Sequence, residues 1–585
     1  MIKKGRVRRY MCLLLALGML LMSSCGTVGN VKDGGVGAGQ GDNSTAEDSN
    51  PGEARGAQQE ENAELLQEEE DITDTNPLNV IDDNYRTYYE VFVYSFYDSD
   101  GDGIGDLQGL ISKLDYINDG DDTTDTDLGC NGIWLMPVHP SPTYHKYDVT
   151  DYYDIDPVYG TLEDFQEFLA ACDKRGIKVI MDLVLNHSSS QHPWFREACD
   201  YLRELGDGEP DTEECPYFDY YYFTKEPASG YSKVSGTDWY YEAQFWSEMP
   251  DLNLDCEALR EEIKDITQYW LDMGVGGFRL DAVKEYYTGN IQDNIDFLSW
   301  LTCMVKTQKE DAYLVGEAWV DISSYAQYYA SGIDSLFDFN FAGAEGVIAK
   351  VMNGSSAERY GTAAAELGEI FGQYNEHYID APFYTNHDMA RSAGYYTGEN
   401  SESRLKMAGA MNLFMSGSAF IYYGEELGMR GSGKDENKRA PMYWSQNADA
   451  AGMCDGPADM DDFEMKYGSL EEQEQDVSSI YRYFKKAVKI RNQNPEIARG
   501  EVEYLEEVSS HNVCVLRKIY DGSELLLVFV TGADAEKVDL SSITLNGHPV
   551  DETTSVRAML IAGEGQITLE GGAFAMPGYS ILVLK

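Results

Sequence analysis

Residues 275–284 read Val-Gly-Gly-Phe-Arg-Leu-Asp-Ala-Val-Lys, a short apolar run with charged residues near its end. Such a run predicts a buried strand of a parallel sheet. Comparable runs lie at residues 312–317 and 383–388. Each of the three ends in a carboxylate: Asp281, Glu317 and Asp388. Carboxylates at the ends of separated strands indicate one site shared by several βα units, as at the C-terminal face of a (β/α)8 barrel.

Short apolar runs and amphipathic stretches alternate on either side of these strands. Strands are expected at 88–94, 132–136 and 177–183, and near residues 276, 313, 335, 380 and 419. Helices are expected at 106–118, 162–175, 257–273, 292–308, 359–371 and 402–415, and residues 485–493 are expected to close the last helix. The alternation predicts an α/β fold, a (β/α)8 TIM barrel formed by residues 81–187 and 252–495. Alternating strands in residues 496–585 predict a C-terminal antiparallel β-sandwich.

Four segments, in this order, resemble the signature regions of the α-amylase superfamily (family 13) of glycoside hydrolases: 182–187, 277–282, 316–319 and 385–388. The resemblance covers about residues 84–585. It implies that residues 188–251, which interrupt the alternation after the third strand, form a small inserted domain. Residues 249–253 are similar to a fifth region in the subgroup intermediate between oligo-1,6-glucosidases and neopullulanases.

The chemistry of this superfamily needs a carboxylate on one face of the sugar and a proton donor at the leaving oxygen. The resemblance implies that Asp281 is the nucleophile, Glu317 the acid/base and Asp388 the stabiliser of the transition state. Crowding of carboxylates raises the pKa of one of them, which would leave Glu317 protonated at the start. Arg279 lies two residues before Asp281, on the same strand face, and would keep Asp281 ionised.

The resemblance also implies a set of substrate-binding residues: Tyr147, Asp148, His187, Arg279, Lys284 and His387. An aromatic face such as that of Tyr147 suits the apolar face of a pyranose ring. The two histidines would donate to sugar hydroxyls, and Lys284 would reach toward the leaving-group side. Glu285 stands where many amylases have His, so the second calcium site that those amylases build with Asn186 is not expected.

The loop at residues 98–106 places acids at alternating positions, which suits a hard cation with oxygen ligands such as Ca²⁺. The loop begins like an EF-hand, but its twelfth position is Gly109 and a strand precedes it. The expected ligands are the side chains of four aspartates and one backbone carbonyl: Asp98, Asp100, Asp102, Asp106 and Ile104. Such a site would be structural, and no organic cofactor is expected.

Charge restricts the partners of the chain. The 44 basic and 102 acidic residues give a net charge of −58, which argues against nucleic acid and anionic lipid as ligands. Neutral sugars are compatible with such a surface. The eight cysteines beyond residue 25 lack metal-binding spacing, and their pairing cannot be derived from the sequence.

The N-terminal 25 residues contain a basic segment, an apolar run at 10–22 and small residues before Cys25. A basic segment before a short apolar run predicts a secretory signal. The residues before Cys25 resemble a bacterial lipobox, in which Cys25 is lipidated. Residues 26–80 are rich in acids and lack aromatics, which predicts a disordered linker. The protein is therefore expected to be exported and lipid-anchored to the membrane at the cell surface.

These observations predict a retaining α-glucan hydrolase that cleaves α-1,4 bonds of starch and maltooligosaccharides. Ala282, directly after the nucleophile, fits α-1,4 better than α-1,6 specificity. The alternatives are an oligo-1,6-glucosidase, a cyclomaltodextrinase or neopullulanase-like enzyme, a 4-α-glucanotransferase, and a non-catalytic glycan-binding lipoprotein. Aromatic residues of the insertion, among them Phe245 and Trp246, are interpreted either as platforms for a glucan chain or as the core of the inserted domain.

Overall fold

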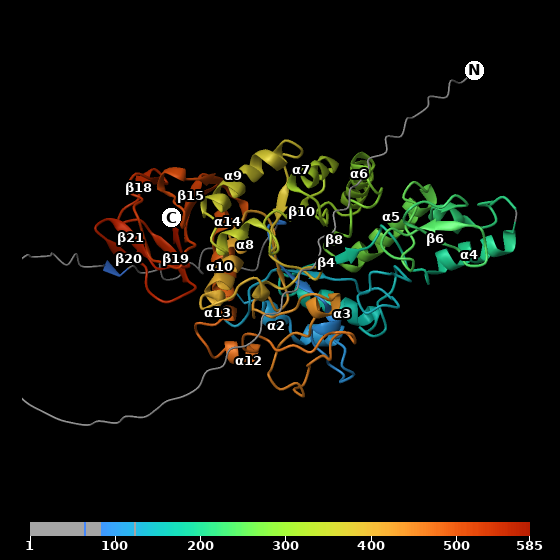
Figure 1. The fold of residues 1–585 in the computed structure, drawn as a ribbon, viewed down its shortest axis with the longest axis horizontal. Coiled ribbons are helices and arrows are strands. Elements are labelled where there is room, and N and C mark those ends of the chain that lie inside the picture. Colours follow the sequence, from blue (N-terminus) through green and yellow to red (C-terminus); the bar gives the residue numbers. More distant parts are fainter. Residues whose placement is uncertain (1–63, 66–82, 122–123, 207) are drawn as a thin grey trace, which may run out of the picture. The chain divides into compact units, whose positions relative to one another are not determined.

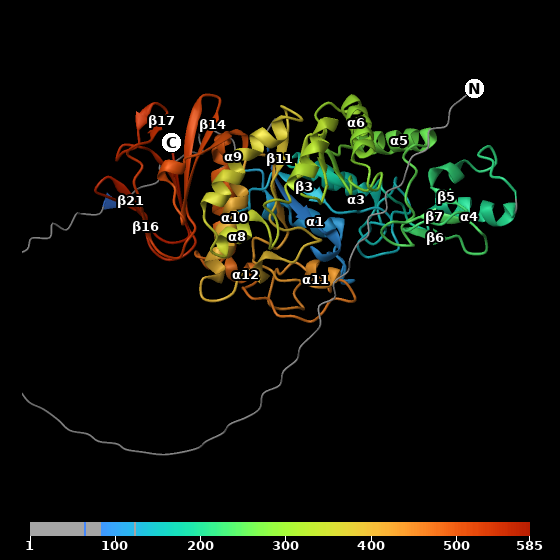
Figure 2. The ribbon, with the colours of Figure 1, turned by 45° about the horizontal axis from the view of Figure 1, so that its top comes forward.

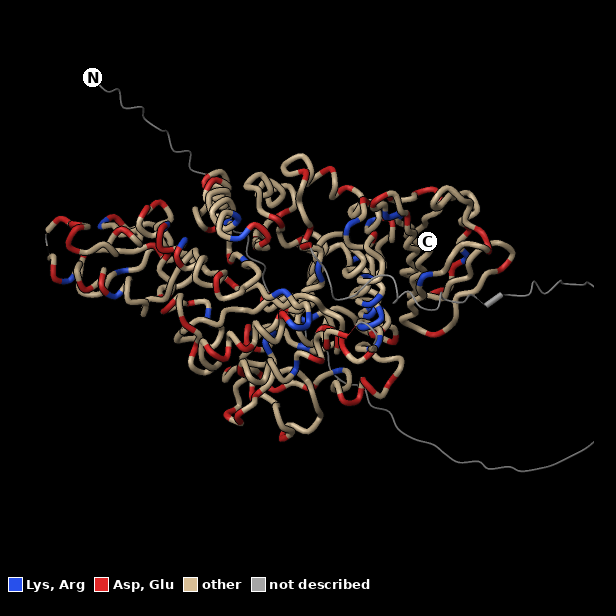
Figure 3. Tube along the Cα trace, turned by 180° about the vertical axis from the view of Figure 1, so that it is seen from behind, with Lys and Arg blue, Asp and Glu red and all other residues tan. Residues whose placement is uncertain are grey.

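The computed structural model describes residues 64–65, 83–121, 124–206 and 208–585. The predicted signal at residues 1–25, with Cys25, lies outside the described residues, and so does most of the predicted linker at 26–80. Among the helices of the described residues, none is both long and apolar enough to cross a bilayer. Acidic residues are spread over all described regions rather than gathered in one patch (Figure 3).

Eight parallel strands form the central barrel (Figure 1). They are β2 (Thr87–Val91), β3 (Gly132–Leu135), β4 (Lys178–Leu183), β8 (Gly277–Leu280), β9 (Tyr313–Gly316), β10 (Ser335–Phe337), β11 (Ile379–Ala381) and β12 (Ala419–Tyr422). Each barrel strand from β2 to β10 pairs with the next barrel strand, and β12 pairs with β2. A parallel bridge between Phe383 and Phe420 brings β11 and β12 together, so the predicted TIM barrel is confirmed.

The interior of the barrel is a packed apolar core with a polar layer above it. Tyr88, Ile180 and Val315 belong to the buried cluster that fills the barrel. Side chains alternate along a strand, so residues two positions further on face the same way. At those positions stand three carboxylates: Glu90, Asp182 and Glu317. The strands therefore carry charged groups toward their carboxyl ends, above an apolar plug.

Helices follow the barrel strands. They are α1 (Leu107–Ser112), α2 (Leu114–Ile117), α3 (Leu162–Asp173), α5 (Glu257–Met273), α6 (Ile291–Gln308), α7 (Ile322–Tyr325), α8 (Val347–Met352), α9 (Glu358–Gly372), α10 (Ser401–Leu413), α11 (Asp435–Lys438), α12 (Leu470–Gln473), α13 (Ile480–Gln493) and α14 (Pro495–Arg499). The helix expected at 106–118 is split at Lys113, whose ammonium lies over the rings of Tyr97 and Trp444. The last barrel helix, α13, ends at Gln493 as expected, and the Ser479 side chain caps its start.

An inserted region lies between β4 and α5. It contains α4 (Pro193–Leu205) and an antiparallel sheet of β5 (Phe223–Thr224), β7 (Tyr240–Glu242) and β6 (Tyr231–Lys233). Its two ends meet at an antiparallel bridge between His187 and Asp251. Five of its aromatic residues are buried: Phe195, Tyr220, Tyr221, Trp239 and Tyr241. Phe245 and Trp246 are 53% and 49% exposed, so these two remain available as platforms.

Two antiparallel sheets form the C-terminal region (Figure 2). One contains β13 (Glu501–Tyr504), β14 (Val513–Tyr520), β15 (Ser523–Val530), β22 (Ser580–Leu584) and β19 (Val556–Ile561). The other contains β1 (Glu64–Leu65), β20 (Thr568–Glu570), β21 (Ala573–Met576) and β16 (Glu536–Val538). A small hairpin joins β17 (Thr544–Leu545) and β18 (His548–Pro549). A separate apolar cluster lies within this region, and the predicted β-sandwich is confirmed.

Strand β1 corrects the linker prediction. Glu64 and Leu65 fall inside residues 26–80, yet they pair antiparallel with Leu569 and Thr568 of β20. An edge strand offers unpaired backbone N–H and C=O groups, which any extended segment can satisfy without burying much apolar surface. Composition alone therefore did not reveal this pairing.

Candidate active site

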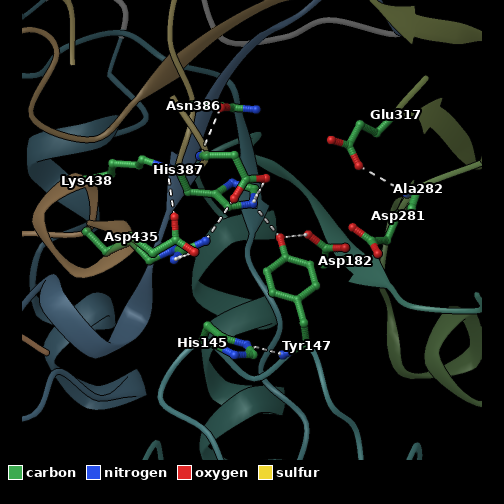
Figure 4. Close-up of polar contacts among 12 residues, drawn as sticks. His145, Tyr147, Asp182, Asp281, Ala282, Glu317, Asn386, His387, Asp435 and Lys438 are labelled. Atoms are coloured by element: carbon green, nitrogen blue, oxygen red, sulfur yellow. Dashed lines mark hydrogen bonds and ion pairs between the residues drawn. The ribbon is translucent and has the colours of Figure 1, made fainter. Parts of the chain in front are cut away.

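A cavity of about 660 Å³ opens at the carboxyl ends of the barrel strands. The predicted triad lines it, with Asp281 directly after β8, Glu317 directly after β9 and Asp388 in the loop that follows β11. Three more predicted residues line the same cavity: Tyr147, His187 and Lys284. Figure 4 shows Asp281 and Glu317 on neighbouring strands, with Tyr147 and Asp182 beside them.

Arg279 connects the two carboxylates on which the predicted reaction depends. Its fully buried guanidinium contacts Asp281 Oδ1 through Nη1 at 2.6 Å and Glu317 Oε2 through Nη2 at 3.0 Å. Nη1 also contacts Asp182 Oδ1 at 2.8 Å. One buried cation therefore holds three carboxylates in fixed positions.

A second group of charges surrounds Asp388. His387 Nε2 lies 3.1 Å from Asp388 Oδ2, and Arg439 Nη2 lies 2.9 Å from Asp388 Oδ1. Burial would raise the pKa of Asp388, but the adjoining His387 and Arg439 outweigh burial and hold that pKa well below its usual range. Asp388 is therefore an anion at neutral pH.

Tyr147 joins the two groups. Its hydroxyl donates to Asp182 Oδ2 at 3.1 Å and lies 2.7 Å from His387 Nε2. Its ring stacks on the His387 ring with 5.6 Å between centroids. Figure 4 shows this hydroxyl pointing toward both partners. A continuous polar network thus runs from Asp388 through His387, Tyr147, Asp182 and Arg279 to the two strand-end carboxylates.

The network contains more carboxylates than cations, and this excess of negative charge affects the pKa of Glu317. Burial raises the pKa of Glu317, Arg279 lowers it, and the charges of Asp281 and Asp388 raise it, with a net upward shift. Burial also raises the pKa of Asp182 to about 7. An upward shift at Glu317 favours the protonated carboxyl that a general acid needs.

The turn after β8 is strained. Ala282 has φ of +45°, in the left-handed region where a side chain costs roughly 1–2 kcal/mol. The Ala282 N–H donates to Glu317 Oε2 at 3.1 Å, and the next N–H, of Val283, donates to the Glu317 carbonyl at 3.0 Å. The strained turn therefore links the residue after Asp281 directly to Glu317.

Three residues predicted to contact substrate do not line the cavity. Arg279 lies within the barrel, beneath the carboxylates, and His387 is covered by the Tyr147 ring. Asp148 is fully buried, and its Oδ1 accepts from the hydroxyls of Ser141 and Thr143. In this structure two of them position other groups of the site, and Asp148 fixes the loop that carries Tyr147. Their contact with sugar stays a prediction.

His187 lines the cavity as predicted. Its Nε2 is buried, and it has no hydrogen-bond partner among the described residues. Burial lowers the pKa of His187, so the ring is neutral at neutral pH. A neutral imidazole nitrogen without a partner, at a cavity wall, suits a sugar hydroxyl.

The cavity also has residues to which the sequence interpretation gave no role. They are His145, Met249, Glu285, Trp319, Asp435, Lys438 and Arg439. Trp319 was visible within the signature segment 316–319, and its exposed ring stacks on Phe339 at 5.2 Å. The long loop after β12 contributes Asp435, Lys438 and Arg439, which belong to α11 and the residue after it. No local sequence pattern predicted that they would line the cavity. Phe245, one of the two exposed aromatic residues of the insertion, lies at the cavity wall, and its role as a platform stays a prediction.

The acidic loop at residues 98–106 brings three side chains together. Asp98, Asp100 and Asp106 can each place a carboxylate oxygen within 4.8 Å of the others. Asp102 lies outside this group, and its Oδ1 accepts from the Ile104 N–H at 2.8 Å. Asp98, Asp100 and Asp106 accept from backbone N–H groups of the loop in the same way, so Asp102 stays a predicted ligand. The three grouped carboxylates form a hard oxygen donor set that suits Ca²⁺.

Comparisons with known proteins agree on one family. A family profile described as the α-amylase catalytic domain matches residues 90–500. Alpha-amylase 3 of Dictyoglomus thermophilum is 40% identical over 72% of this chain and 79% of its own length. Glucan 1,6-alpha-glucosidase of Streptococcus pneumoniae is 30% identical over 83% of this chain and 97% of its own. The solved structure of Eubacterium rectale Amy13B is 51% identical, covering 88% of this chain and 98% of that one, with a TM-score of 0.83.

Proposed function

This chain belongs to the α-amylase family of glycoside hydrolases, and from that premise we propose that it cleaves α-1,4-glucosidic bonds of starch and maltooligosaccharides with retention. The observation that carries the proposal is the shared contact of Asp281 and Glu317 with one Arg279 guanidinium. Two carboxylates on one guanidinium are close neighbours. Retaining enzymes work with about 5–5.5 Å between their carboxyl groups, whereas inverting enzymes need about 6.5–9.5 Å.

In the first step, Glu317 gives its proton to the glycosidic oxygen while a carboxylate oxygen of Asp281 attacks the anomeric carbon. The bond to the leaving sugar breaks, and a glycosyl ester forms on Asp281. In the second step, the Glu317 carboxylate takes a proton from water, whose oxygen attacks the anomeric carbon and releases Asp281. Two inversions leave the product in the α configuration.

Asp388 acts as an anion that binds the hydroxyls of the reacting ring. Its contacts with His387 and Arg439 keep it ionised and fix its orientation. Hydrogen bonds that strengthen as the ring flattens lower the barrier. His187, with its unpartnered Nε2, binds a hydroxyl of the same ring, and the Tyr147 ring supports the apolar sugar face.

The preference for α-1,4 bonds is supported by the similarity to an alpha-amylase and by Ala282. A second candidate, cleavage of α-1,6 bonds, is favoured by the similarity to a glucan 1,6-alpha-glucosidase. Cyclomaltodextrinases and 4-α-glucanotransferases would use the same intermediate and differ in cleft shape or in the acceptor.

A time course of products from soluble starch, maltotriose, isomaltose and pullulan separates these candidates. Early mixed maltooligosaccharides from starch, with isomaltose untouched, are the expected result. Glucose from isomaltose would contradict the α-1,4 assignment and support the second candidate. Panose from pullulan, whose release requires cleavage of an α-1,4 bond, would instead identify a neopullulanase-like enzyme. Binding of starch without any cleavage would identify a non-catalytic glycan-binding protein.

We propose that the carboxylates of Asp98, Asp100 and Asp106 hold a structural Ca²⁺. Removing calcium with a chelator is expected to lower the melting temperature by a few degrees, because a ligand at about 100 times its Kd stabilises by about 2.7 kcal/mol. Differential scanning calorimetry with and without calcium measures the shift. Asp100→Asn should abolish the shift, while Asp173→Asn, at an exposed position of α3 outside the loop, should keep it. A calcium shift that survives in Asp100→Asn would contradict the assignment.

We also propose that the protein is exported and lipid-anchored through Cys25, on the basis of the basic and apolar segments before that residue. Cys25→Ala is expected to move the protein from the membrane fraction to the medium, because one cysteine carries the whole anchor. Fractionation of cells expressing either form measures the distribution. An unchanged membrane fraction for Cys25→Ala would contradict lipidation there.

A further inference from the structure

Glu90 is a buried carboxylate that the reaction described above does not use. It lies in β2, is 1% exposed, and does not line the cavity. Its Oε1 lies 2.5 Å from Nδ1 of His387, which is fully buried. Glu90 therefore reaches the other residues of the site through the imidazole ring of His387.

We propose that Glu90 is a positioning residue of the reaction, which keeps His387 doubly protonated so that His387 holds both Tyr147 and Asp388 in place. The inference rests on the proposed function of the site. Glu90 touches neither substrate nor cavity and acts only through His387.

The argument begins with the two ring nitrogens of His387. Nδ1 faces Glu90, while Nε2 faces the Tyr147 hydroxyl at 2.7 Å and Asp388 Oδ2 at 3.1 Å. A neutral ring has one nitrogen without a proton. If that nitrogen were Nε2, its lone pair would face the Asp388 carboxylate. If it were Nδ1, its lone pair would face Glu90. Burial raises the pKa of Glu90, while His387 and Arg279 lower it. When Glu90 and Asp388 are both ionised, only the imidazolium satisfies the two carboxylates.

The contacts of the Tyr147 hydroxyl also require a proton on Nε2 of His387. It donates its proton to Asp182 Oδ2 at 3.1 Å, so its contact with His387 requires that Nε2 be the donor. Loss of the Nε2 proton would force Tyr147 to choose between His387 and Asp182. The orientation of the ring that lines the cavity thus depends on the protonation of a histidine beneath it.

The surrounding charges determine how firmly this proton is held. Burial lowers the pKa of His387, but Asp388 and Glu90 raise it, with a net result of about 9. Asp182 of β4 also faces His387, whereas Arg279 of β8 faces Glu90 and Arg439 faces Asp388. The Trp134 ring packs edge-on against the imidazole at 5.6 Å. Of these groups, Glu90 is the carboxylate that contacts Nδ1.

The test is Glu90→Gln, which keeps the shape of the side chain and removes its charge. Loss of one adjacent anion is expected to lower the pKa of His387 by about 1–3 units. A shift of about two units would leave roughly a tenth of His387 protonated at pH 8, against nearly all at pH 6. The loss of kcat should therefore be roughly tenfold larger at pH 8 than at pH 6. Glu90→Asp, which retains a charge further from Nδ1, should lie between wild type and Glu90→Gln.

Two readouts are measured on the full chain: the kcat–pH profile on maltooligosaccharides, and the titration of His387 by NMR of the protein with labelled histidine. The chain has 8 histidines, so His387→Asn can assign the signal. Glu426→Gln is the matched control, because Glu426 is also fully buried but accepts from the hydroxyls of Tyr89 and Tyr116 outside this network. It should change neither readout.

An unchanged His387 titration in Glu90→Gln and Glu90→Asp would overturn the proposal, and so would equal losses of kcat at pH 6 and pH 8. The NMR readout does not require turnover. A protein that cleaves no glucan but shows the shifted titration would contradict the proposed function while leaving the Glu90–His387 interaction established.

Discussion

Replacing Asp281 by asparagine is expected to lower kcat on soluble starch by about 10⁴-fold or more, as removal of a nucleophile does in other covalent mechanisms. An amide in that position cannot form the glycosyl ester. Arg279 would retain its contacts with Asp182 and Glu317, so the arrangement of the site should persist. Because the network carries more carboxylates than cations, loss of this charge should leave the melting temperature unchanged or slightly higher.

The measurement pairs kcat with calorimetric binding of maltohexaose, which Asp281→Asn should still bind. Asp435→Asn is the matched control, since Asp435 lines the same cavity and contacts Arg439 at 3.5 Å but has no part in the reaction. It should retain kcat within about tenfold, because it affects only how Arg439 is held. If Asp281→Asn hydrolyses starch as well as this control does, Asp281 is not the nucleophile.

Replacing Glu317 by glutamine should reduce starch hydrolysis by about 10³-fold or more, because general acid–base catalysis typically contributes 10²–10⁴-fold and here serves both steps. The loss should be far smaller in the first step with α-maltosyl fluoride, whose leaving group needs no proton. Burial and neighbouring carboxylates raise the pKa of Glu317, and its acid form disappears as pH rises through that pKa. The variant should therefore lose the alkaline limb of the wild-type kcat profile.

Azide offers an independent check on Glu317→Gln. It can attack the glycosyl ester without a general base, so it should restore turnover of α-maltosyl fluoride and give the α-glycosyl azide. The readouts are fluoride release and NMR of the product. Equal losses on starch and on the fluoride, with no rescue by azide, would contradict the acid/base role.

The barrel was predictable from the sequence because its strands are short apolar runs separated by amphipathic helices. Asp281, Glu317 and Asp388 were predictable because strand ends of a parallel barrel converge on one face. Glu90 and Asp182 were not singled out, although the alternation of side chains along β2 and β4 puts each two residues beyond an inward-facing core residue. The alternation of side chains along these two strands could therefore have identified Glu90 and Asp182 from the sequence.

Other features depend on contacts between distant segments, which no local pattern encodes. Arg439 reaches Asp388 from the loop after β12, and the hydroxyls of Ser141 and Thr143 donate to Oδ1 of the buried Asp148. The split between α1 and α2 accompanies the packing of Lys113 on Trp444. Strand β1 depends on a free edge of β20, far along the chain.

The central claim is that a glycosyl ester forms on Asp281. Mass spectrometry of peptides from Glu317→Gln, quenched during turnover of α-maltosyl fluoride, tests this claim most directly, because the second step is slow in that variant. The predicted result is a maltosyl adduct on the peptide that contains Asp281, absent from a double variant with Asp281→Asn. Fluoride release without any adduct, or an adduct on a different carboxylate, would contradict the account.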